Sequence, residues 1–190
     1  MPDRSNGYEE YADTFIRSRS ASLGLDVMRD WARQFTRGAE VLELGCGHGV
    51  ISEVLVEAGL ALFAVDASPT LLGAFHDRFP YVETDCSAVE ESKFFGRTFD
   101  GVVAWGLLFL LEEDAQRDVL TKVGNALRPG GRFLFTAPRE SIEWVDAMTE
   151  RPSRSLGAVR YEQFLRGIGL EVSSGVTDEG ENYYYYVTKR

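Results

Sequence analysis

The sequence predicts an α/β fold: a doubly wound, mostly parallel sheet of seven strands with helices on both faces and an antiparallel hairpin at the C-terminal end. Three observations support this prediction. Short runs rich in Val, Leu and Phe alternate with longer amphipathic stretches. No internal repeat or low-complexity tract interrupts the alternation. The short runs are also apolar enough to be covered on both faces, as strands of a parallel sheet are.

Five of the short runs are predicted as strands of the central sheet. They are Glu40–Leu44, Ala61–Val65, Pro80–Glu83, Phe99–Trp105 and Arg132–Thr136. Crossover helices are expected over Val50–Ala58, Pro69–Arg78 and Asp114–Leu127, which carry apolar residues at helical spacing. The Pro and Gly residues of Arg128–Gly131 then end the last helix. Right-handed crossovers place the ligand site beyond the carboxyl ends of the strands.

The two ends of the chain depart from this alternation. Gly24–Phe35 reads as an amphipathic helix, and the polar, aromatic-bearing segment Tyr8–Ser20 is either helical or a lid. Near the other end, Tyr161–Ile168 is predicted to be helical. Leu170–Ser173 and Asn182–Thr188 are predicted to form the antiparallel closing hairpin, because a loop containing glycines joins them.

Charge and cysteine content narrow the function classes. Thirty acidic residues against twenty basic ones give a net charge of −10, which repels phosphate backbones and anionic membrane surfaces in the absence of a basic patch. We therefore expect neither a nucleic-acid partner nor a membrane partner. Cys46 and Cys86 lack metal-ligand spacing, so no metal is expected. The polar N-terminus and the lack of a run approaching about 20 apolar residues favour a cytoplasmic protein.

The strongest local pattern is VLELGCGHGV, in which a buried-type strand runs into a turn with glycine at positions 45, 47 and 49. Glycines let the backbone turn tightly and approach a ligand closely, because a Cβ would occupy ligand space. A phosphate loop of the Walker type would need Gly-Lys-Ser/Thr, which is absent. A dinucleotide turn, Gly-x-Gly-x-x-Gly, would need glycine where Val50 stands, which weakens an oxidoreductase interpretation without eliminating it.

The run Glu43–Gly49 resembles the first motif of class I S-adenosylmethionine-dependent methyltransferases, which have a Rossmann-like fold. The resemblance continues in order from about Val41 to Pro138: Asp66 in FAVDAS, Asp85 in VETDCSA, then FDGVVAWGLLFLL and LRPGGRFLFTAP. It implies S-adenosylmethionine as cofactor and S-adenosylhomocysteine as product.

The resemblance also implies roles for individual residues. Glu43, Gly45 and Gly47 would meet the methionine end of the cofactor, Asp66 both ribose hydroxyls, and Asp85 the adenine. The further residues expected to line the cofactor pocket are Cys46, Ala67, Cys86 and Trp105, with Tyr11 and Arg19 from the N-terminal segment near the cofactor carboxylate.

Several of these residues have structural alternatives. Asp66 could cap the following helix, although Ser68 is the better N-cap and Pro69 suits the first helical position. Asp85 could make a turn with its own backbone. Trp105 is either a cation–π partner of the sulfonium or core filling. Members of the family often have histidine at the position of Phe109, so no catalytic base is assigned, and Trp105 and Phe109 are candidates for the acceptor-side wall.

The remaining expectations concern the acceptor side and the histidines. Trp144–Ser155, within an irregular stretch after Thr136, is expected to face the N-terminal lid, and acceptor selectivity should reside in these two segments. The side chain of His48 is expected to point away from the ligand, and His76 lies on a predicted helix.

The chain is thus predicted to be one domain, 1–190. Its parts are an N-terminal helical or lid segment 1–37, a cofactor-binding core 38–138, a substrate-side insertion 139–160, and a C-terminal helix with closing strands 161–190. The leading hypothesis is in-line methyl transfer to a small-molecule acceptor. The alternatives are a non-catalytic S-adenosylmethionine-binding or interaction protein and an NAD(P)-dependent oxidoreductase. The acceptor atom and the oligomeric state stay open.

Overall fold

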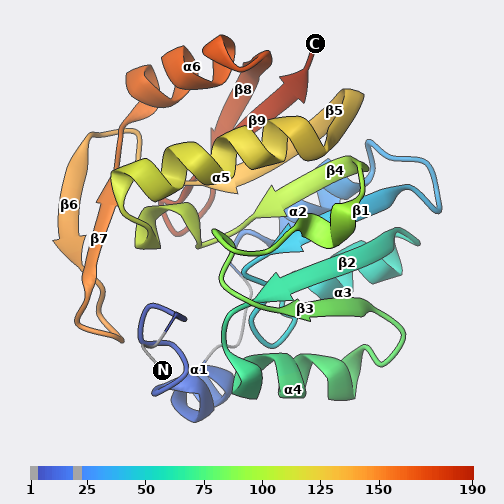
Figure 1. The fold of residues 1–190 in the computed structure, drawn as a ribbon, viewed down its shortest axis with the longest axis vertical. Helices are drawn as coiled ribbons and strands as arrows, with labels where there is room; N and C mark the ends of the chain where they lie inside the picture. Colours follow the sequence, from blue (N-terminus) through green and yellow to red (C-terminus); the bar gives the residue numbers. More distant parts are fainter. Residues whose placement is uncertain (1–3, 19–22) are drawn as a thin grey trace.

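A seven-stranded sheet forms the centre of the molecule, in the order β3-β2-β1-β4-β5-β9-β8 (Figure 1). The computed structural model describes residues 4–18 and 23–190. Strands β1 to β5 are mutually parallel, and β9 runs antiparallel between β5 and β8. The strands are β1 (Glu40–Leu44), β2 (Ala61–Asp66), β3 (Glu83–Cys86), β4 (Phe99–Ala104), β5 (Leu127–Thr136), β8 (Leu170–Thr177) and β9 (Tyr183–Lys189). The predicted fold class is confirmed.

Helices cover both faces of this sheet. On one face, α5 (Glu113–Ala126) and α6 (Ala158–Gly167) pack on an apolar cluster with Leu42 and Leu44 of β1. On the other, α2 (Leu25–Ala32), α3 (Ser52–Glu57) and α4 (Pro69–Arg78) pack on a second cluster with Val41. Alternate residues of β1 thus serve opposite faces, as the pleat requires. Among the described residues, no helix is long and apolar enough to cross a membrane.

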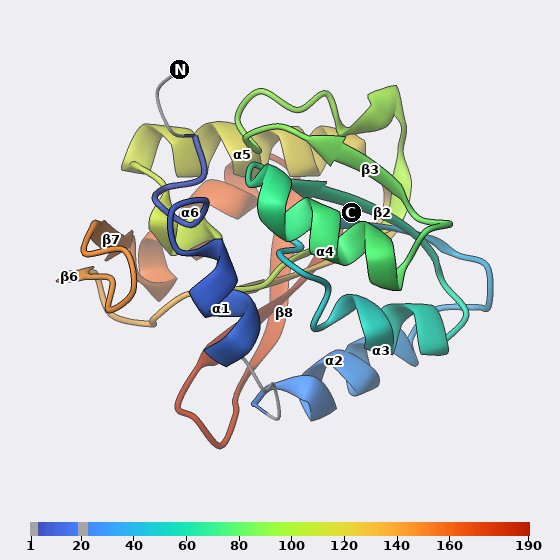
Figure 2. The same cartoon turned by 90° about the horizontal axis from the view of Figure 1, so that it is seen from below.

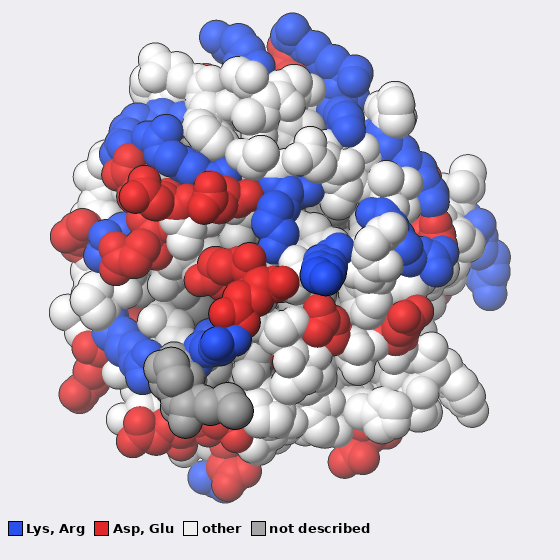
Figure 3. All heavy atoms as spheres, in the orientation of Figure 1, with Lys and Arg blue, Asp and Glu red and all other residues white. Residues whose placement is uncertain are grey.

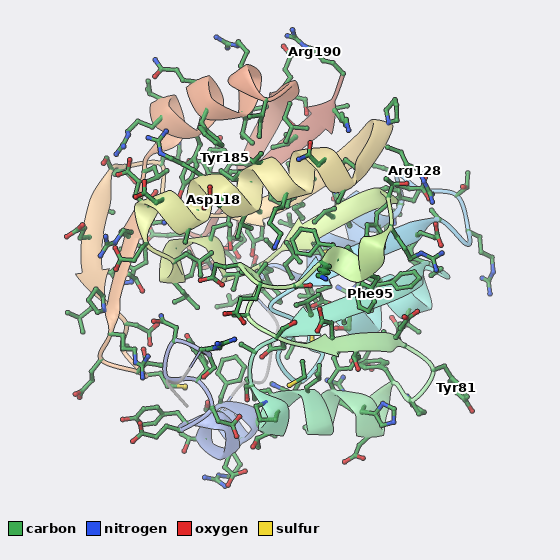
Figure 4. All side chains as sticks on the ribbon, viewed as in Figure 1. Tyr81, Phe95, Asp118, Arg128, Tyr185 and Arg190 are labelled. Carbon is green, nitrogen blue, oxygen red and sulfur yellow. The ribbon has the colours of Figure 1, made fainter. Side chains whose placement is uncertain are left out.

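The third strand lies three residues later than predicted. The expectation of a strand over Pro80–Glu83 is wrong because the chain turns after α4, with the Val82 N–H donating to the Phe79 carbonyl, and Tyr81 is 98% exposed (Figure 4). The observed strand, Glu83–Cys86, pairs only with β2 and forms an edge of the sheet. Edge strands need less apolar character than central ones, so the more apolar residues before it misled the sequence argument.

The insertion after β5 is also more regular than predicted. It contains a two-stranded hairpin, β6 (Ile142–Val145) paired with β7 (Pro152–Ser155), which stands apart from the main sheet (Figure 1). The other differences are at element ends. Helix α3 starts two residues later than predicted, and β5 starts at Leu127, five residues early. In the N-terminal segment, the structure contains α1 (Ala12–Ser18).

A buried polar cluster ties the hairpin to the helices on its side of the sheet. The Gln116 side chain on α5 donates from Nε2 to the carbonyl oxygens of Leu111 (2.9 Å) and Arg154 (3.1 Å). Its Oε1 accepts the hydroxyl of Tyr161 on α6 at 2.7 Å. Both side chains belong to fully buried residues. One amide therefore joins α5, α6 and the hairpin.

Replacing Tyr161 with Phe tests this connection. The change leaves a buried amide oxygen of Gln116 without its donor, which costs about 1–3 kcal/mol. We expect the free energy of unfolding, measured by chemical denaturation, to fall by that amount. Tyr186→Phe is the control, because the Tyr186 hydroxyl makes only a long contact of 3.5 Å with the Val27 carbonyl. Equal losses in the two variants would contradict a special role for Tyr161.

Candidate functional site

The glycine turn follows β1 directly and uses left-handed backbone at all three glycines. The φ angles of Gly45, Gly47 and Gly49 are 70°, 54° and 86°, values that strongly favour glycine. Space is also limiting at Gly49, where an added Cβ would lie 2.5 Å from Cε2 of Phe79. The Gly45 N–H donates to the Val65 carbonyl at 2.8 Å. The turn is therefore bonded to the end of β2.

Asp66, the last residue of β2, completes this connection. Its Oδ2 accepts the Gly47 N–H at 2.7 Å, and its Oδ1 accepts the Ser68 N–H at 2.8 Å. Burial raises the pKa of Asp66, and the two backbone donors partly offset that rise. The charge of Glu9 raises it further. The carboxylate thus holds the glycine turn and the start of α4 in a fixed relation.

Glu43 is a second acidic residue at this edge of the sheet. It is 1% exposed, and its Oε2 accepts the Ser52 hydroxyl of α3 at 2.6 Å. A buried carboxylate is stabilised only if polar partners surround it. Glu43 therefore belongs to the polar floor of the site, next to the turn that it precedes in the sequence.

The N-terminal segment lies across the carboxyl ends of these strands, between α4 and the β6–β7 hairpin (Figure 2). Three contacts hold it there. The Glu9 carboxylate accepts the hydroxyls of Ser68 and Thr70 at the N-terminus of α4, Arg4 pairs with Glu91, and the Tyr8 hydroxyl donates to Asp146 at 3.3 Å. We call residues 4–10 the roof of the site.

A pocket of about 870 Å³, measured out to its opening, lies between the glycine turn and the roof. Polar and apolar side chains both line it. The lining includes Arg4, Ser5, Asn6, Tyr8, Phe15, Glu43, Gly45, Cys46, Gly47, His48, Asp66, Ala67, Leu71, Ser87, Ala88, Val89, Glu90, Trp105, Gly106, Leu107, Leu110 and Leu111.

Most of the residues predicted for the site line this pocket. Those that do are Glu43, Gly45, Cys46, Gly47, Asp66, Ala67 and Trp105. Tyr11, Asp85, Cys86 and Phe109 are not among the lining residues. Phe109 instead packs on Trp144 of β6, with ring centroids 5.3 Å apart. Arg19 lies outside the described residues.

Asp85 has structural partners instead. Its carboxylate accepts the hydroxyls of Ser87 and Ser92, the latter at 2.7 Å. Lys122 of α5 holds the same loop, donating from Nζ to the carbonyls of Val89 (2.7 Å) and Ser92 (2.6 Å). Together these bonds shape the segment 87–90 that lines the pocket.

Sequence reasoning missed several lining residues. His48 is a lining residue, and its buried ring packs edge-on against Phe15 at 5.5 Å. Phe15 packs in turn on Tyr8 at 5.3 Å. The N-terminal segment was expected to be helical or a lid, and the sequence alone did not show which of its aromatic residues faces the pocket.

A hydrogen-bond chain orients Trp105 on the wall of the pocket. The indole Nε1–H donates to the Tyr184 hydroxyl at 3.0 Å, and this hydroxyl donates to Asp178 at 2.9 Å. Burial, and then the hydrogen bond to Asp178, raise the pKa of Tyr184. Asp178, in the loop between β8 and β9, therefore supports Trp105 through the Tyr184 hydroxyl.

The fold and the glycine turn define an α/β domain of the class that binds nucleoside cofactors beyond the carboxyl ends of its strands. A family model for the methyltransferase domain matches residues 41–131. The chain is 37% identical over 110 residues to the cypemycin N-terminal methyltransferase of a Streptomyces species, covering 54% of this chain and 44% of that relative. It is 30% identical over 162 residues to the mitochondrial ubiquinone biosynthesis O-methyltransferase of Schizosaccharomyces pombe, covering 76% of this chain and 57% of that relative.

Solved structures agree with this fold. The Burkholderia thailandensis 1,6-didemethyltoxoflavin-N1-methyltransferase, with 1,6-didemethyltoxoflavin and S-adenosylhomocysteine bound, superposes with a TM-score of 0.78 at 22% identity, covering 98% of this chain and 86% of that one. The magnesium protoporphyrin IX methyltransferase of Synechocystis superposes with a TM-score of 0.77 at 13% identity, covering 100% of this chain and 98% of that one. The chain belongs to the class I S-adenosylmethionine-dependent methyltransferases. It spans about half the length of the curated relatives it matches.

Replacing Tyr184 with Phe tests the support of Trp105. The indole N–H loses its acceptor, so we expect the free energy of unfolding to fall by about 1–3 kcal/mol and the Trp105 indole proton to exchange faster with solvent in NMR measurements. Tyr183→Phe is the control, because Tyr183 packs on the opposite face of the sheet. Unchanged exchange at Trp105 in Tyr184→Phe would refute the proposed support.

Proposed function

We propose that the chain binds S-adenosylmethionine in this pocket and transfers its methyl group to a small-molecule acceptor. One observation carries the proposal. A turn of three left-handed glycines is bonded through the Gly47 N–H to the carboxylate of Asp66, and both line one pocket beyond the carboxyl ends of β1 and β2. Family membership makes this cofactor the expected occupant.

The residues present fit that cofactor. Gly47 and Gly106 line the pocket without side chains, and a Cβ on Gly106 would point into open space. Asp66 is assigned to the ribose hydroxyls, since a carboxylate can accept two hydrogen bonds from a vicinal diol. Glu43 and Gly45 are assigned to the methionine end. For the adenine we assign the walls Ala88 and Val89, and give Asp85 the role of shaping their loop.

When bound, the cofactor supplies a methyl group made electrophilic by the sulfonium. The chain's own part is then to align the acceptor and exclude water. Leu107, Leu110 and Leu111 provide an apolar wall for this purpose. Phe109 packs against Trp144 and offers no proton acceptor. We therefore propose that the rate enhancement comes from positioning of the acceptor, because Phe109 cannot accept a proton.

Two observations favour a small acceptor. The roof lies over the pocket and is fixed to α4 and to the hairpin, so a bulky substrate would have to displace it. On the face drawn in Figure 3, acidic side chains lie over and beside α5 with basic ones among them. The net charge of −10 disfavours nucleic acid as a substrate. One relative is named as a cypemycin N-terminal methyltransferase and the other as a ubiquinone biosynthesis O-methyltransferase, so their names do not agree on one acceptor.

Calorimetry with S-adenosylhomocysteine and with NAD⁺ tests the proposal. We expect the first to bind and the second not to bind. Replacing Asp66 with Asn should weaken S-adenosylhomocysteine binding by about 10- to 100-fold, the range for a hydrogen bond to a charged group. Asp77→Asn, on the exposed side of α4, is the control. Binding of NAD⁺ alone would make the oxidoreductase alternative the better one. Binding without turnover on any metabolite would favour a non-catalytic protein.

The affinity for S-adenosylhomocysteine should also depend on pH. Ionised Asp66 is the better acceptor for the ribose hydroxyls, and its pKa is raised above the ordinary value of 3.8 by burial. Affinity is therefore full above the raised pKa and falls as pH drops through it, at a higher pH than an ordinary aspartate would give. Calorimetry from pH 8 downward measures the effect, and the dependence should disappear in Asp66→Asn. A dependence that persists in that variant would assign it to another group.

A further inference from the structure

The roof contains a turn with unusual backbone at two successive residues. Asn6 and Gly7 have φ angles of 53° and 92°, and among residues other than glycine, asparagine is one of the few that tolerate such values. Gly7 is packed closely against the loop between β6 and β7. A Cβ there would lie 2.9 Å from Nε of Arg151 and 3.0 Å from Cβ of Thr149. The turn is therefore fixed in position on the hairpin.

Asn6 is one of the residues that line the pocket, and its side-chain amide nitrogen lacks a hydrogen-bond partner among the described residues. Within residues 4–18 and 23–190, its Nδ2 is buried and makes no hydrogen bond. Buried amide donors are almost always paired in folded proteins because an unpaired donor is costly. An unpaired donor on a closely packed turn at a pocket wall therefore indicates a binding function.

The position of Asn6 assigns this donor to the acceptor side of the pocket. Its neighbour Gly7 contacts the β6–β7 loop, and β7 packs on the 3₁₀ turn Leu108–Leu110 that follows β4. Asp66 ends β2 and Ala88 follows β3. In the sheet order these two strands lie on one side of β1, and β4 lies on the other. The neighbour of Asn6 is thus held on the hairpin, whereas Asp66 and Ala88 come from the other side of β1.

We propose that Asn6 determines acceptor specificity by donating a hydrogen bond from Nδ2 to an oxygen or ring nitrogen of the methyl acceptor. This inference rests on the proposed function. Leu107, Leu110 and Leu111 line the same pocket, so the rest of the acceptor is apolar. The substrate class is a small, largely apolar molecule that carries a carbonyl, carboxylate or ring nitrogen near the atom to be methylated.

The first measurement separates this inference from the proposed function. Calorimetry compares S-adenosylhomocysteine binding by the unmodified protein, Asn6→Ala and Asn125→Ala, the last being an exposed asparagine on α5. We expect equal affinities within about twofold. If the unmodified protein does not bind, the proposed function fails. If only Asn6→Ala binds at least tenfold more weakly, Asn6 serves the cofactor and this inference alone is overturned.

The second measurement uses matched acceptor probes on the S-adenosylhomocysteine complex: aniline against 2-aminobenzamide, and catechol against 2,3-dihydroxybenzoate. The chain has three asparagines and three glutamines, so the Asn6 side-chain amide signal can be identified in NMR spectra by its loss in Asn6→Ala. We expect the carbonyl-bearing member to bind at least fivefold more tightly and to shift that signal. Asn125→Ala should keep this preference and Asn6→Ala should lose it. No preference in the unmodified protein, or one that persists in Asn6→Ala, overturns the inference.

Discussion

The hydrogen bond from the Gly47 N–H to the Asp66 carboxylate is the contact on which the site depends. It joins the turn after β1 to the end of β2 at 2.7 Å, so the two parallel strands present one continuous edge. The same carboxylate accepts the Ser68 N–H, which fixes where α4 starts. Ser68 caps α4, and its hydroxyl also donates to Glu9 of the roof. The position of the roof therefore depends on Asp66 and Ser68. The buried carboxylate of Asp66 thus orders the floor of the pocket and one of the contacts that hold the roof.

The two sides of the pocket are built differently. On the proposed cofactor side, main-chain turns and short side chains from the sheet form the surface, and their geometry follows from strand pairing. On the other side, the roof and the β6–β7 hairpin hold each other through Tyr8, Asp146 and Gly7. Neither belongs to the main sheet. This second surface can change in sequence while the first is retained, which is how one scaffold accommodates different acceptors.

The elements that the sequence predicted well are those whose signal is local. Strands β1, β2 and β4 are short, mainly apolar segments, and the glycine turn has a backbone requirement that other residues rarely meet. The polar edge strand β3 was misjudged because it is not an apolar run, and β7 of the hairpin was missed because the side chains that it buries are serines. Asp85 illustrates the same limit at the site. The family resemblance assigned it to the adenine, but in the structure its carboxylate accepts the hydroxyls of Ser87 and Ser92, and spacing alone does not reveal such partners.

The roof residues were the hardest to predict, and the reason is physical. Arg4, Asn6 and Tyr8 line the pocket only because their segment is held by residues far away in the chain, such as Glu91 and Asp146. No periodicity within residues 4–10 encodes those contacts. The Asn6-Gly7 pair is a local turn signal, yet it does not indicate what the turn faces. The tertiary structure is needed to show that the Asn6 amide is a buried donor in a residue that lines the pocket.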